Sequence, residues 1–418
     1  MIGRRDLVRS GAALAAASGL PRPAGAAAVV RIGFLDSFSG VFSDLGGYHK
    51  AGALVALEDA NTSSRVRFEV VFGDDASQPA VGSNELRRLV KQEKVDAICG
   101  GTSSAVGLAT SALAESLGIF NLECGPQDSS ITGAKANATT FRFGPNVRML
   151  VNALSRRILA LGKRWYFIQA DYALGKDAYA QLSALLRRAG GTEVGLDVLP
   201  LGTSDFSSAL TKVRNSDADV LILANSGGDA ANTIKQFVSF GLEKRMKLAG
   251  ISGEDIYARA IPLDAVAGAT FPVLWAPTLP PSAKLAQRLR RAFPREPVSA
   301  RHYLGYMTMR QLIEGIKAAG TTRADQLVTT FSDRSFDGAK ASRSTFRGCD
   351  HQCVQDVYAG AVVGQATFAR TQYMYRIVAE VSAAESDGTC SDPWALAART
   401  AIAAEKIPER DDYTPKTF

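Results

Sequence analysis

The segment VVRIGFLDSFSG, residues 29–40, contains the unit from which the fold is built. Residues 29–35 form an apolar run, interrupted only by Arg31 and Gly33, with the length and character of a buried β-strand. A polar loop at 36–40 ends the run, and apolar residues then recur at spacings of three and four as far as Asn61. That spacing is typical of an amphipathic helix. The stretch therefore predicts a strand, a loop and a helix in succession.

The same alternation recurs along most of the chain. Further strands are predicted at 66–72, 95–99, 119–122, 165–169, 194–199, 220–224, 248–251 and 269–275. Helices are predicted between and after them, for example at 105–117, 149–161, 285–293 and 303–319. Apolar strands that alternate with amphipathic helices predict parallel sheets covered on both faces. Because these strands are too many for one sheet, we expect an α/β fold with two open parallel-sheet lobes.

Composition and charge exclude several classes of protein. The chain has 418 residues, of which 46% are hydrophobic and 21% charged, as in an ordinary globular protein of two or three domains. The formal net charge of +7 is spread along the chain, so nucleic acid is not an expected partner. Beyond the N-terminus no apolar run approaches the roughly 18 residues that a membrane span requires. Three histidines leave little room for a His-rich metal site, and we expect no metal.

Residues 1–28 are predicted to be an export signal. Arg4 and Arg5 precede an apolar stretch at 10–20 that is too short to span a bilayer, and the small residues 24–26 suit a signal peptidase. This pattern favours twin-arginine export, with an ordinary Sec signal as the alternative. No cysteine precedes Cys99, so we expect no lipid anchor and a soluble protein in the periplasm.

The five cysteines allow at most two disulfides in an oxidising compartment. The Cys349 and Cys353 pair has no second ligand pair at a zinc spacing, so we expect a disulfide that involves Cys353, with Cys349 or Cys390 as its partner. Cys99 and Cys124 lie at the ends of apolar strands and are predicted to be buried and unpaired.

The loops that follow four predicted strands are rich in serine, threonine and glycine. They are residues 39–40, 100–104, 124–127 and 225–229. Open parallel sheets bind ligands at the carboxyl ends of their strands, where backbone N–H groups and helix dipoles favour a small anion such as a carboxylate. Any one loop could merely cap its helix. Four together predict a binding cleft.

Sequence motifs of common enzymes were not found. The chain lacks a G-x-S-x-G nucleophile elbow, a phosphate-binding P-loop and a G-x-G-x-x-G dinucleotide turn. His49, His302 and His351 have no persuasive nucleophile beside them and are predicted to be structural. We therefore expect that the protein is not an enzyme and that it binds no cofactor.

Several segments together resemble a known family. They are Ile32 to Leu35 with Ser39-Gly40, Asp171-Tyr172 with Gly175, the run from Asn225 to Leu242, and Arg347 with Asp350-His351-Gln352. In this combination the chain resembles, over roughly residues 30–365, the type I periplasmic substrate-binding proteins of ABC importers that bind branched-chain amino acids, amides or aromatic acids.

The resemblance implies two lobes joined by a three-stranded hinge. Lobe one would hold residues 29–146 and 277–354, and lobe two residues 147–276 and 355–386. Residues 387–418 would form a C-terminal surface extension.

The resemblance also implies the ligand contacts. Lobe one would hold a carboxylate with Ser103, Ser104 and the segment from Gly125 to Gln127, under Phe42. Lobe two would close over it with Tyr172, Asn225, Ser226 and Glu254. Three of these residues have a structural alternative: Tyr172 as a packed turn aromatic, Phe42 as a loop anchor and Glu254 as a helix cap.

The expected ligand is a small organic carboxylate. Amino-acid binders of this family carry an aromatic residue where this chain has Ser226 and need an acid for the ammonium, which Glu254 or Asp255 could supply. The segment after Glu123, the Asp171-Tyr172 turn and the segment 225–229 are similar to the branch of the family that binds aromatic or other non-amino carboxylic acids, so an aromatic acid is favoured over an amino acid. The expected partner is an ABC permease in the inner membrane, served by a monomer that closes on its ligand. The alternatives are a ligand-sensing partner of a periplasmic receptor and, least favoured, a secreted α/β hydrolase.

Overall fold

The computed structural model describes residues 28–63, 66–403 and 406–418. The predicted export signal lies outside these residues, apart from residue 28. Within the described ranges, no helix is long and apolar enough to cross a membrane.

The first sheet contains five parallel strands in the order β2-β1-β3-β4-β5. They are β1 (Val29–Asp36), β2 (Arg67–Asp74), β3 (Ala97–Gly100), β4 (Asn121–Glu123) and β5 (Thr140–Arg142). The helices between them are α1 (Ser43–Ser63), α2 (Pro79–Lys91), α3 (Ser104–Ser116) and the short η1 (Ser129–Thr132). Parallel neighbours joined by helices are the arrangement that the alternating sequence pattern predicts.

The second sheet contains seven strands in the order β15-β14-β10-β9-β8-β6-β7. They are β6 (Arg164–Ala170), β7 (Thr192–Leu199), β8 (Val220–Ala224), β9 (Lys247–Gly250), β10 (Thr270–Val273), β14 (Val357–Val362) and β15 (Tyr375–Val381). Its helices are α4 (Val147–Leu159), α5 (Ala173–Arg188), α6 (Ser207–Asn215), α7 (Gly227–Ser239) and α11 (Gln365–Thr371), with the short η2 (Leu242–Lys244) and η3 (Asp255–Tyr257). The last two strands, β14 and β15, run antiparallel to their neighbours.

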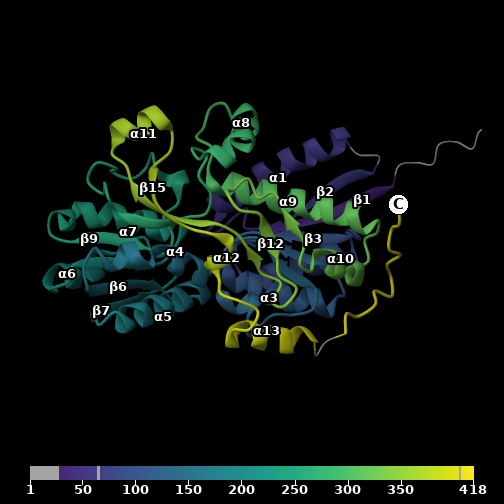
Figure 1. Cartoon of the computed structure of the whole chain (residues 1–418), viewed down its shortest axis with the longest axis horizontal. Helices are drawn as coiled ribbons and strands as arrows, with labels where there is room; N and C mark the ends of the chain where they lie inside the picture. Colours follow the sequence, from purple (N-terminus) through teal and green to yellow (C-terminus); the bar gives the residue numbers. More distant parts are fainter. Residues whose placement is uncertain (1–27, 64–65, 404–405) are drawn as a thin grey trace, which may run out of the picture.

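The segment between β10 and β14 returns to the first sheet. It contains η4 (Pro280–Ser282), α8 (Ala283–Ala292), α9 (Ala300–Ala319), α10 (Ala324–Phe331) and a small sheet of β11 (Ser335–Phe336), β12 (Ser344–Phe346) and β13 (Cys353–Val354). Figure 1 shows the first sheet with α1 and α9 on the right and the second sheet with α5 to α7 on the left. The expected α/β fold with two parallel-sheet lobes is confirmed.

Two glycines allow α9 to lie directly against α1. A Cβ on Gly52 would stand 2.0 Å from the carbonyl oxygen of His302, and one on Gly305 would stand 1.9 Å from that of His49. Because neither position has room for a side chain, the two backbones approach closely. This contact places the start of α9 beside the carboxyl end of β1.

The C-terminal residues pack against the first lobe through specific contacts. After β15 come α12 (Ala383–Ser386) and α13 (Pro393–Ala403), and a Cβ on Gly133 would stand 2.0 Å from the ring of Trp394. Farther along, the Tyr413 hydroxyl donates to Asp96 Oδ1 at 2.6 Å. The extension predicted at 387–418 therefore includes a helix, and it is anchored by the half-buried side chains of Trp394 and Tyr413.

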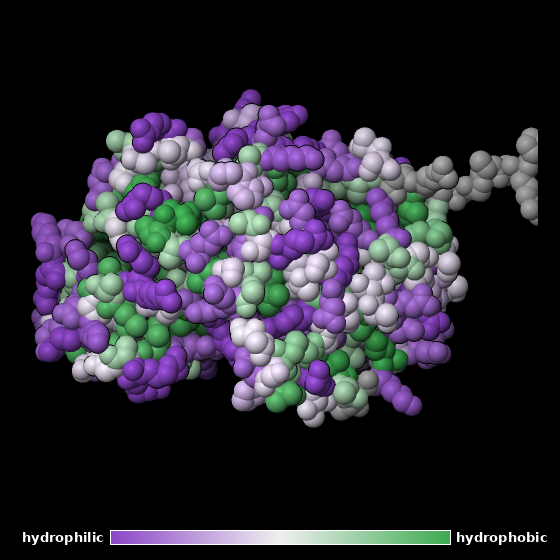
Figure 2. All heavy atoms as spheres, in the orientation of Figure 1, coloured by the Kyte–Doolittle hydropathy of each residue, from purple (hydrophilic) through white to green (hydrophobic). Residues whose placement is uncertain are grey.

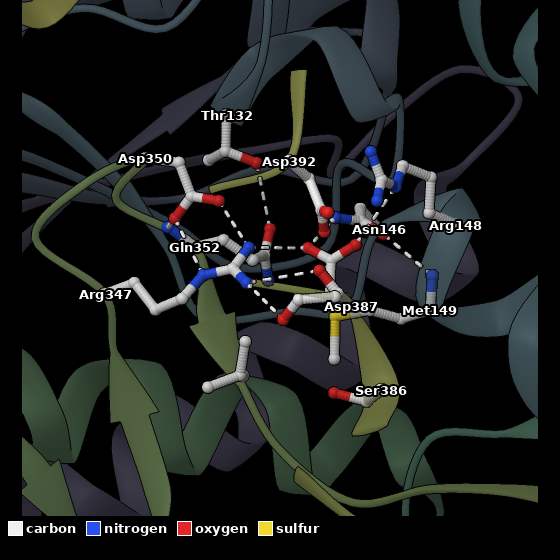
Figure 3. A network of polar contacts seen from close by, with 12 residues as sticks. Thr132, Asn146, Arg148, Met149, Arg347, Asp350, Gln352, Ser386, Asp387 and Asp392 are labelled. Carbon is white, nitrogen blue, oxygen red and sulfur yellow. Dashed lines mark hydrogen bonds and ion pairs between the residues drawn. The ribbon is translucent and has the colours of Figure 1, made fainter. Parts of the chain in front are cut away.

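Asp387 lies at the centre of a buried polar network (Figure 3). Its Oδ2 accepts hydrogen bonds from Asn146 Nδ2 and from Arg347 Nη2, each at 2.9 Å, and Arg148 pairs with its Oδ1 at 3.2 Å. Arg347 also donates from Nε to Asp350 at 3.1 Å. The network joins the segment after β15 to the start of α4 and to the loop before β13.

The expected disulfide involving Cys353 is wrong, because the bond joins Cys349 to Cys390 with their Cα atoms 5.9 Å apart. Cys353 lies in β13 with its side chain packed in the hydrophobic core, whereas Cys349 lies in the preceding loop, which the C-terminal segment reaches. Cys99 and Cys124 are buried and free, as predicted.

Hydrophilic residues cover most of the face seen in Figure 2, and hydrophobic residues lie between them in small patches. Among the described residues, the large hydrophobic side chains that are well exposed lie far apart in the sequence: Leu54, Val198, Leu396 and Phe418. Such scattered exposure is normal for a protein surface.

Candidate ligand-binding site between the lobes

Four predicted site residues stand directly before helices at the carboxyl ends of strands. Ser103 precedes α3, Tyr172 precedes α5, Ser226 precedes α7 and Glu254 precedes η3. In each case the side chain makes no capping hydrogen bond to its own helix. The alternative that Glu254 serves as a helix cap is therefore wrong, and these side chains are available for other contacts.

Phe42 and Tyr172 bring the two lobes together on one side of the site. Their ring centroids are 5.8 Å apart, and both side chains are buried. Gly227 lies against the ring of Phe42, since a Cβ on this glycine would stand 3.1 Å from Phe42 Cδ1. Burial raises the pKa of the Tyr172 phenol well above its usual value, so this group stays neutral and can donate a hydrogen bond.

Arg301 and Glu254 form a buried ion pair across the lobes. Arg301, near the start of α9, donates from Nε to Glu254 Oε2 at 2.8 Å and from Nη2 to Oε1. Their side chains are only 2% and 6% exposed. Burial by itself would raise the pKa of Glu254, but the charge and hydrogen bonds of Arg301 outweigh it, so the pKa lies below its ordinary value.

On lobe one, Arg301 lies next to a buried histidine. Asp36, at the end of β1, accepts hydrogen bonds from Thr102 Oγ1 at 2.6 Å and from His49 Nδ1 at 3.0 Å. With Nδ1 as the donor, His49 Nε2 presents a lone pair to Arg301 Nη1, 3.5 Å away. A Cβ on Gly125 would stand 2.8 Å from His49 Cε1 and 3.2 Å from Arg301 Nη1, so only glycine fits there.

On lobe two, a row of hydroxyl groups leads from Glu254 to Tyr172. Ser252 donates to Glu254 Oε1 at 2.7 Å, and Ser226 Oγ lies 3.1 Å from Ser252 Oγ. Ser226 also lies near the Tyr172 hydroxyl and partly offsets the rise in its pKa. Asn225 uses its Nδ2 within the same lobe, where it donates to Thr233 Oγ1.

In lobe one, Ser104 already uses two of the backbone N–H donors that were expected near a ligand carboxylate. Ser104 Oγ accepts hydrogen bonds from the backbone N–H groups of Gln127 and Asp128, each at 3.1 Å. Ser103 Oγ, Gln127 Oε1 and Asn225 Oδ1 are buried with no hydrogen-bond partner. Buried polar atoms without partners are uncommon in folded proteins and mark places where a ligand or water belongs.

A small cavity of about 20 Å³ lies between the lobes at this point. Gln127 lines it from lobe one, and the segment from Ser252 to Asp255 lines it from lobe two. Its volume is about that of one water molecule. The lobes are thus in a closed arrangement.

Contacts around the site hold the lobes closed. Ser129 N donates to Asp177 Oδ2 at 2.8 Å, and Ala300 N donates to Asp255 Oδ2 at 3.0 Å. Tyr257 Oη lies 3.3 Å from Asp44 Oδ2. Each of these contacts joins a residue of lobe one to a residue of lobe two.

The structure thus joins most of the predicted site residues into one cluster. The cluster contains Phe42, Ser104, Gly125, Gln127, Tyr172, Ser226 and Glu254. Sequence reasoning missed Arg301 and Ser252 and treated His49 as purely structural. A single arginine before a predicted helix carries no motif, whereas Ser252, directly after the strand predicted at 248–251, could have been found from its position. In the described part of the chain, no group of three or more His, Cys, Asp or Glu side chains could hold a metal ion.

Comparison with known proteins agrees with this architecture. The model of the family described as periplasmic binding protein matches residues 29–367. The Leu/Ile/Val-binding protein homolog 7 of Brucella suis biovar 1 (strain 1330) is 29% identical over 236 residues, which is 54% of this chain and 59% of that protein. The chain thus spans about three fifths of the length of that relative.

Solved structures cover more of the chain. A periplasmic binding protein of Burkholderia mallei has a TM-score of 0.81 at 25% identity and covers 90% of this chain and 99% of its own. Another similar structure is a solute-binding protein of an ABC transporter from Rhodopseudomonas palustris BisB5, in complex with 3,4-dihydroxybenzoic acid. Its TM-score is 0.77 at 19% identity, and the match covers 85% of this chain and 98% of that protein.

Proposed function

The chain belongs to the periplasmic binding protein family, and on that basis we propose that it captures a small organic carboxylate between its lobes and delivers it to the permease of an ABC importer. Residues 1–28 would be removed on export, and the mature protein would act as a monomer in the periplasm. Lobe one would comprise 29–146 and 277–354, and lobe two 147–276 and 355–386.

One observation carries this proposal. Side chains at the strand ends of both lobes, among them Ser103, Tyr172, Ser226 and Glu254, do not cap their own helices. All four are buried. Side chains that only ended helices would bond the first-turn N–H groups. Arg301 engages Glu254. A binding site explains the placement of the other three, because a ligand would meet polar groups from both lobes.

We expect lobe one to bind the carboxylate end of the ligand. The N-terminus of α3 and the backbone N–H groups of Gln127 and Asp128 meet at Ser104. Ligand oxygens could accept from Ser103 Oγ and Ser104 Oγ in a region where the helix dipole favours negative charge.

Function then follows from a shift in population rather than from bond chemistry. Open and closed forms exchange, and a ligand that contacts both lobes stabilises the closed form. The permease would recognise that form. The contact between Phe42 and Tyr172 and the ion pair of Arg301 with Glu254 are available only when the lobes are together.

The comparisons suggest two ligand classes to test. The Brucella relative is named for leucine, isoleucine and valine, and the Rhodopseudomonas structure holds 3,4-dihydroxybenzoic acid. We would screen amino acids, amides, aromatic acids and short aliphatic acids by thermal shift with the mature protein and confirm each shift by calorimetry.

A true ligand stabilises the folded protein by about 2.7 kcal/mol at a hundredfold excess over its dissociation constant. We expect at least one carboxylate to give such a shift and to be recovered unchanged. No shift from any carboxylate would contradict the proposal, and chemical turnover of the bound acid would favour a hydrolase.

A further inference from the structure

From the contact between Arg301 and Glu254 we propose that the ligand is a carboxylate without an α-ammonium group, because Arg301 occupies from within the chain the position that a ligand cation would need. This inference rests on the proposed function and narrows its ligand class.

Both carboxylate oxygens of Glu254 already accept hydrogen bonds from within the chain. Its Oε1 accepts from Ser252 and from Arg301 Nη2, and its Oε2 accepts from Arg301 Nε. The bidentate geometry holds the guanidinium in one plane with the carboxylate. Arg301 is further enclosed by His49 and Gly125. The ion pair is therefore internally neutral.

Of the other acids near the site, Asp36 is engaged through both oxygens and Asp255 through one. Asp36 accepts from Ser37 N, Thr102 and His49. Asp255 accepts from Ala300 N through Oδ2, and its Oδ1 is buried without a partner. Burial raises the pKa of Asp255 to about 7, so its neutral form is well populated at neutral pH.

An ammonium group in this site would therefore lose its water shell next to Arg301, while Glu254, the partner of that arginine, has no uncompensated charge left to replace the water. Burial of such a charge is unfavourable unless it is paired. A carboxylate meets the opposite situation, because Arg301 Nη1 has only the long 3.5 Å contact to His49 and keeps donor capacity.

The test uses pairs of acids that differ only in the amino group. Calorimetry on the mature protein would compare 3-phenylpropanoate with phenylalanine and 4-methylpentanoate with leucine, with benzoate and 3,4-dihydroxybenzoate as aromatic acids. We expect every detectable ligand to lack the amino group and to bind at least tenfold more tightly than its amino counterpart where one exists.

Tighter or equal binding of phenylalanine or leucine would overturn the inference while leaving the proposed carboxylate capture intact. If no acid of this panel and no carboxylate of the thermal-shift screen binds, both the inference and the proposed function are overturned.

Three variants test the role of Arg301 directly. Arg301→Met frees Glu254, and the affinity ratio within each pair should move at least tenfold toward the amino acid. The double variant Arg301→Met with Glu254→Gln should lose that shift, and Arg301→Lys should keep the wild-type preference. Arg310→Met, on the partly exposed side of α9 where Arg310 pairs with Glu314, is the matched control.

Circular dichroism and melting curves would establish that each variant folds. If Arg301→Met does not fold, the wild-type pairs and Arg301→Lys still decide the question. A loss of preference in Arg301→Lys would exclude the positive charge as its source. An unchanged ratio in a folded Arg301→Met would overturn the assignment to Arg301.

Discussion

The ring of Phe42, just before α1, lies 5.8 Å from the ring of Tyr172, just before α5. The two residues follow strands of different sheets, so their contact exists only when the lobes are together. Aromatic pairs contribute about 0.5–1.5 kcal/mol beyond the area that they bury. This pair therefore belongs to the closed form and reports on closure.

We predict that Tyr172→Ala weakens binding of the acid that gives the largest thermal shift by about tenfold, because both the ring contact and the hydroxyl near Ser226 are lost. Tyr172→Phe should lose less, since it keeps the ring. Calorimetry measures both. The control is Tyr179→Phe on α5, which loses only a hydroxyl bonded to Glu193 in β7. Equal affinity in Tyr172→Ala and wild type would contradict the site assignment.

The disulfide of Cys349 with Cys390 should stabilise the mature protein. It closes a sequence separation of 41 residues, for which chain entropy predicts about 3–4 kcal/mol. We expect Cys390→Ser to lower the urea midpoint and to abolish the effect of reductant on stability. Cys353→Ser, at a buried free cysteine, should retain the reductant effect. A reductant-sensitive Cys390→Ser would exclude this pairing.

Asp387→Asn should destabilise the fold strongly. The substitution removes the charge that compensates Arg347 and Arg148 in a buried network (Figure 3). Breaking a buried ion pair by removing one partner typically costs about 3–5 kcal/mol. Equilibrium urea unfolding measures the change, with Asp411→Asn in the exposed tail as the comparison. A change below about 1 kcal/mol would show that the network is solvated.

Glu123 should make the protein less stable as pH rises. Burial raises the pKa of this carboxyl from 4.5 to about 8, so between these values the folded state keeps a proton that the unfolded chain has released. The free energy of unfolding therefore falls through this window, by an amount on the order of 4 kcal/mol.

Glu123→Gln should flatten the profile of unfolding free energy from pH 5 to 8 and should be more stable than wild type at pH 8. The Gln side chain can still accept from Asn121 Nδ2, as Glu123 does at 2.9 Å. Asp75 and Asp255, whose pKa values burial raises to about 7, should leave part of the slope. The profile of Glu69→Gln, a partly exposed position in β2, should match wild type. A slope unaltered in Glu123→Gln would refute the assignment.

The sequence pattern predicted the long buried strands well. The strand expected at 220–224 coincides with β8, and those expected at 165–169 and 194–199 differ from β6 and β7 by at most two residues at either end. Their continuous apolar runs reflect burial on both faces, which is a local property of the sequence. Of the strands that were missed, β5 and β11 to β13 are two or three residues long and β15 lies at an antiparallel edge, so none shows a comparable pattern. The strand β14 is a continuous, buried apolar run that the sequence pattern could have revealed.

The site was predicted in part, for a similar reason. The loops of Ser104 and Ser226 could be named because they follow apolar strands, and parallel sheets place such loops at one edge. Tyr172 was named through the family resemblance. Arg301 follows no strand and stands alone at a helix start, so its role depends on the packing of α9 against α1 through Gly52 and Gly305.

The amino-acid sequence by itself therefore determined the alternation of strands and helices, the two lobes and the loops that carry the candidate site, because each depends on the order of apolar and polar residues over short distances. Only the tertiary structure decided that Arg301 neutralises Glu254 and that Cys349, rather than Cys353, bonds to Cys390. Both contacts join segments far apart in the chain. Their formation depends on how helices cross and how the lobes close, which no local periodicity encodes.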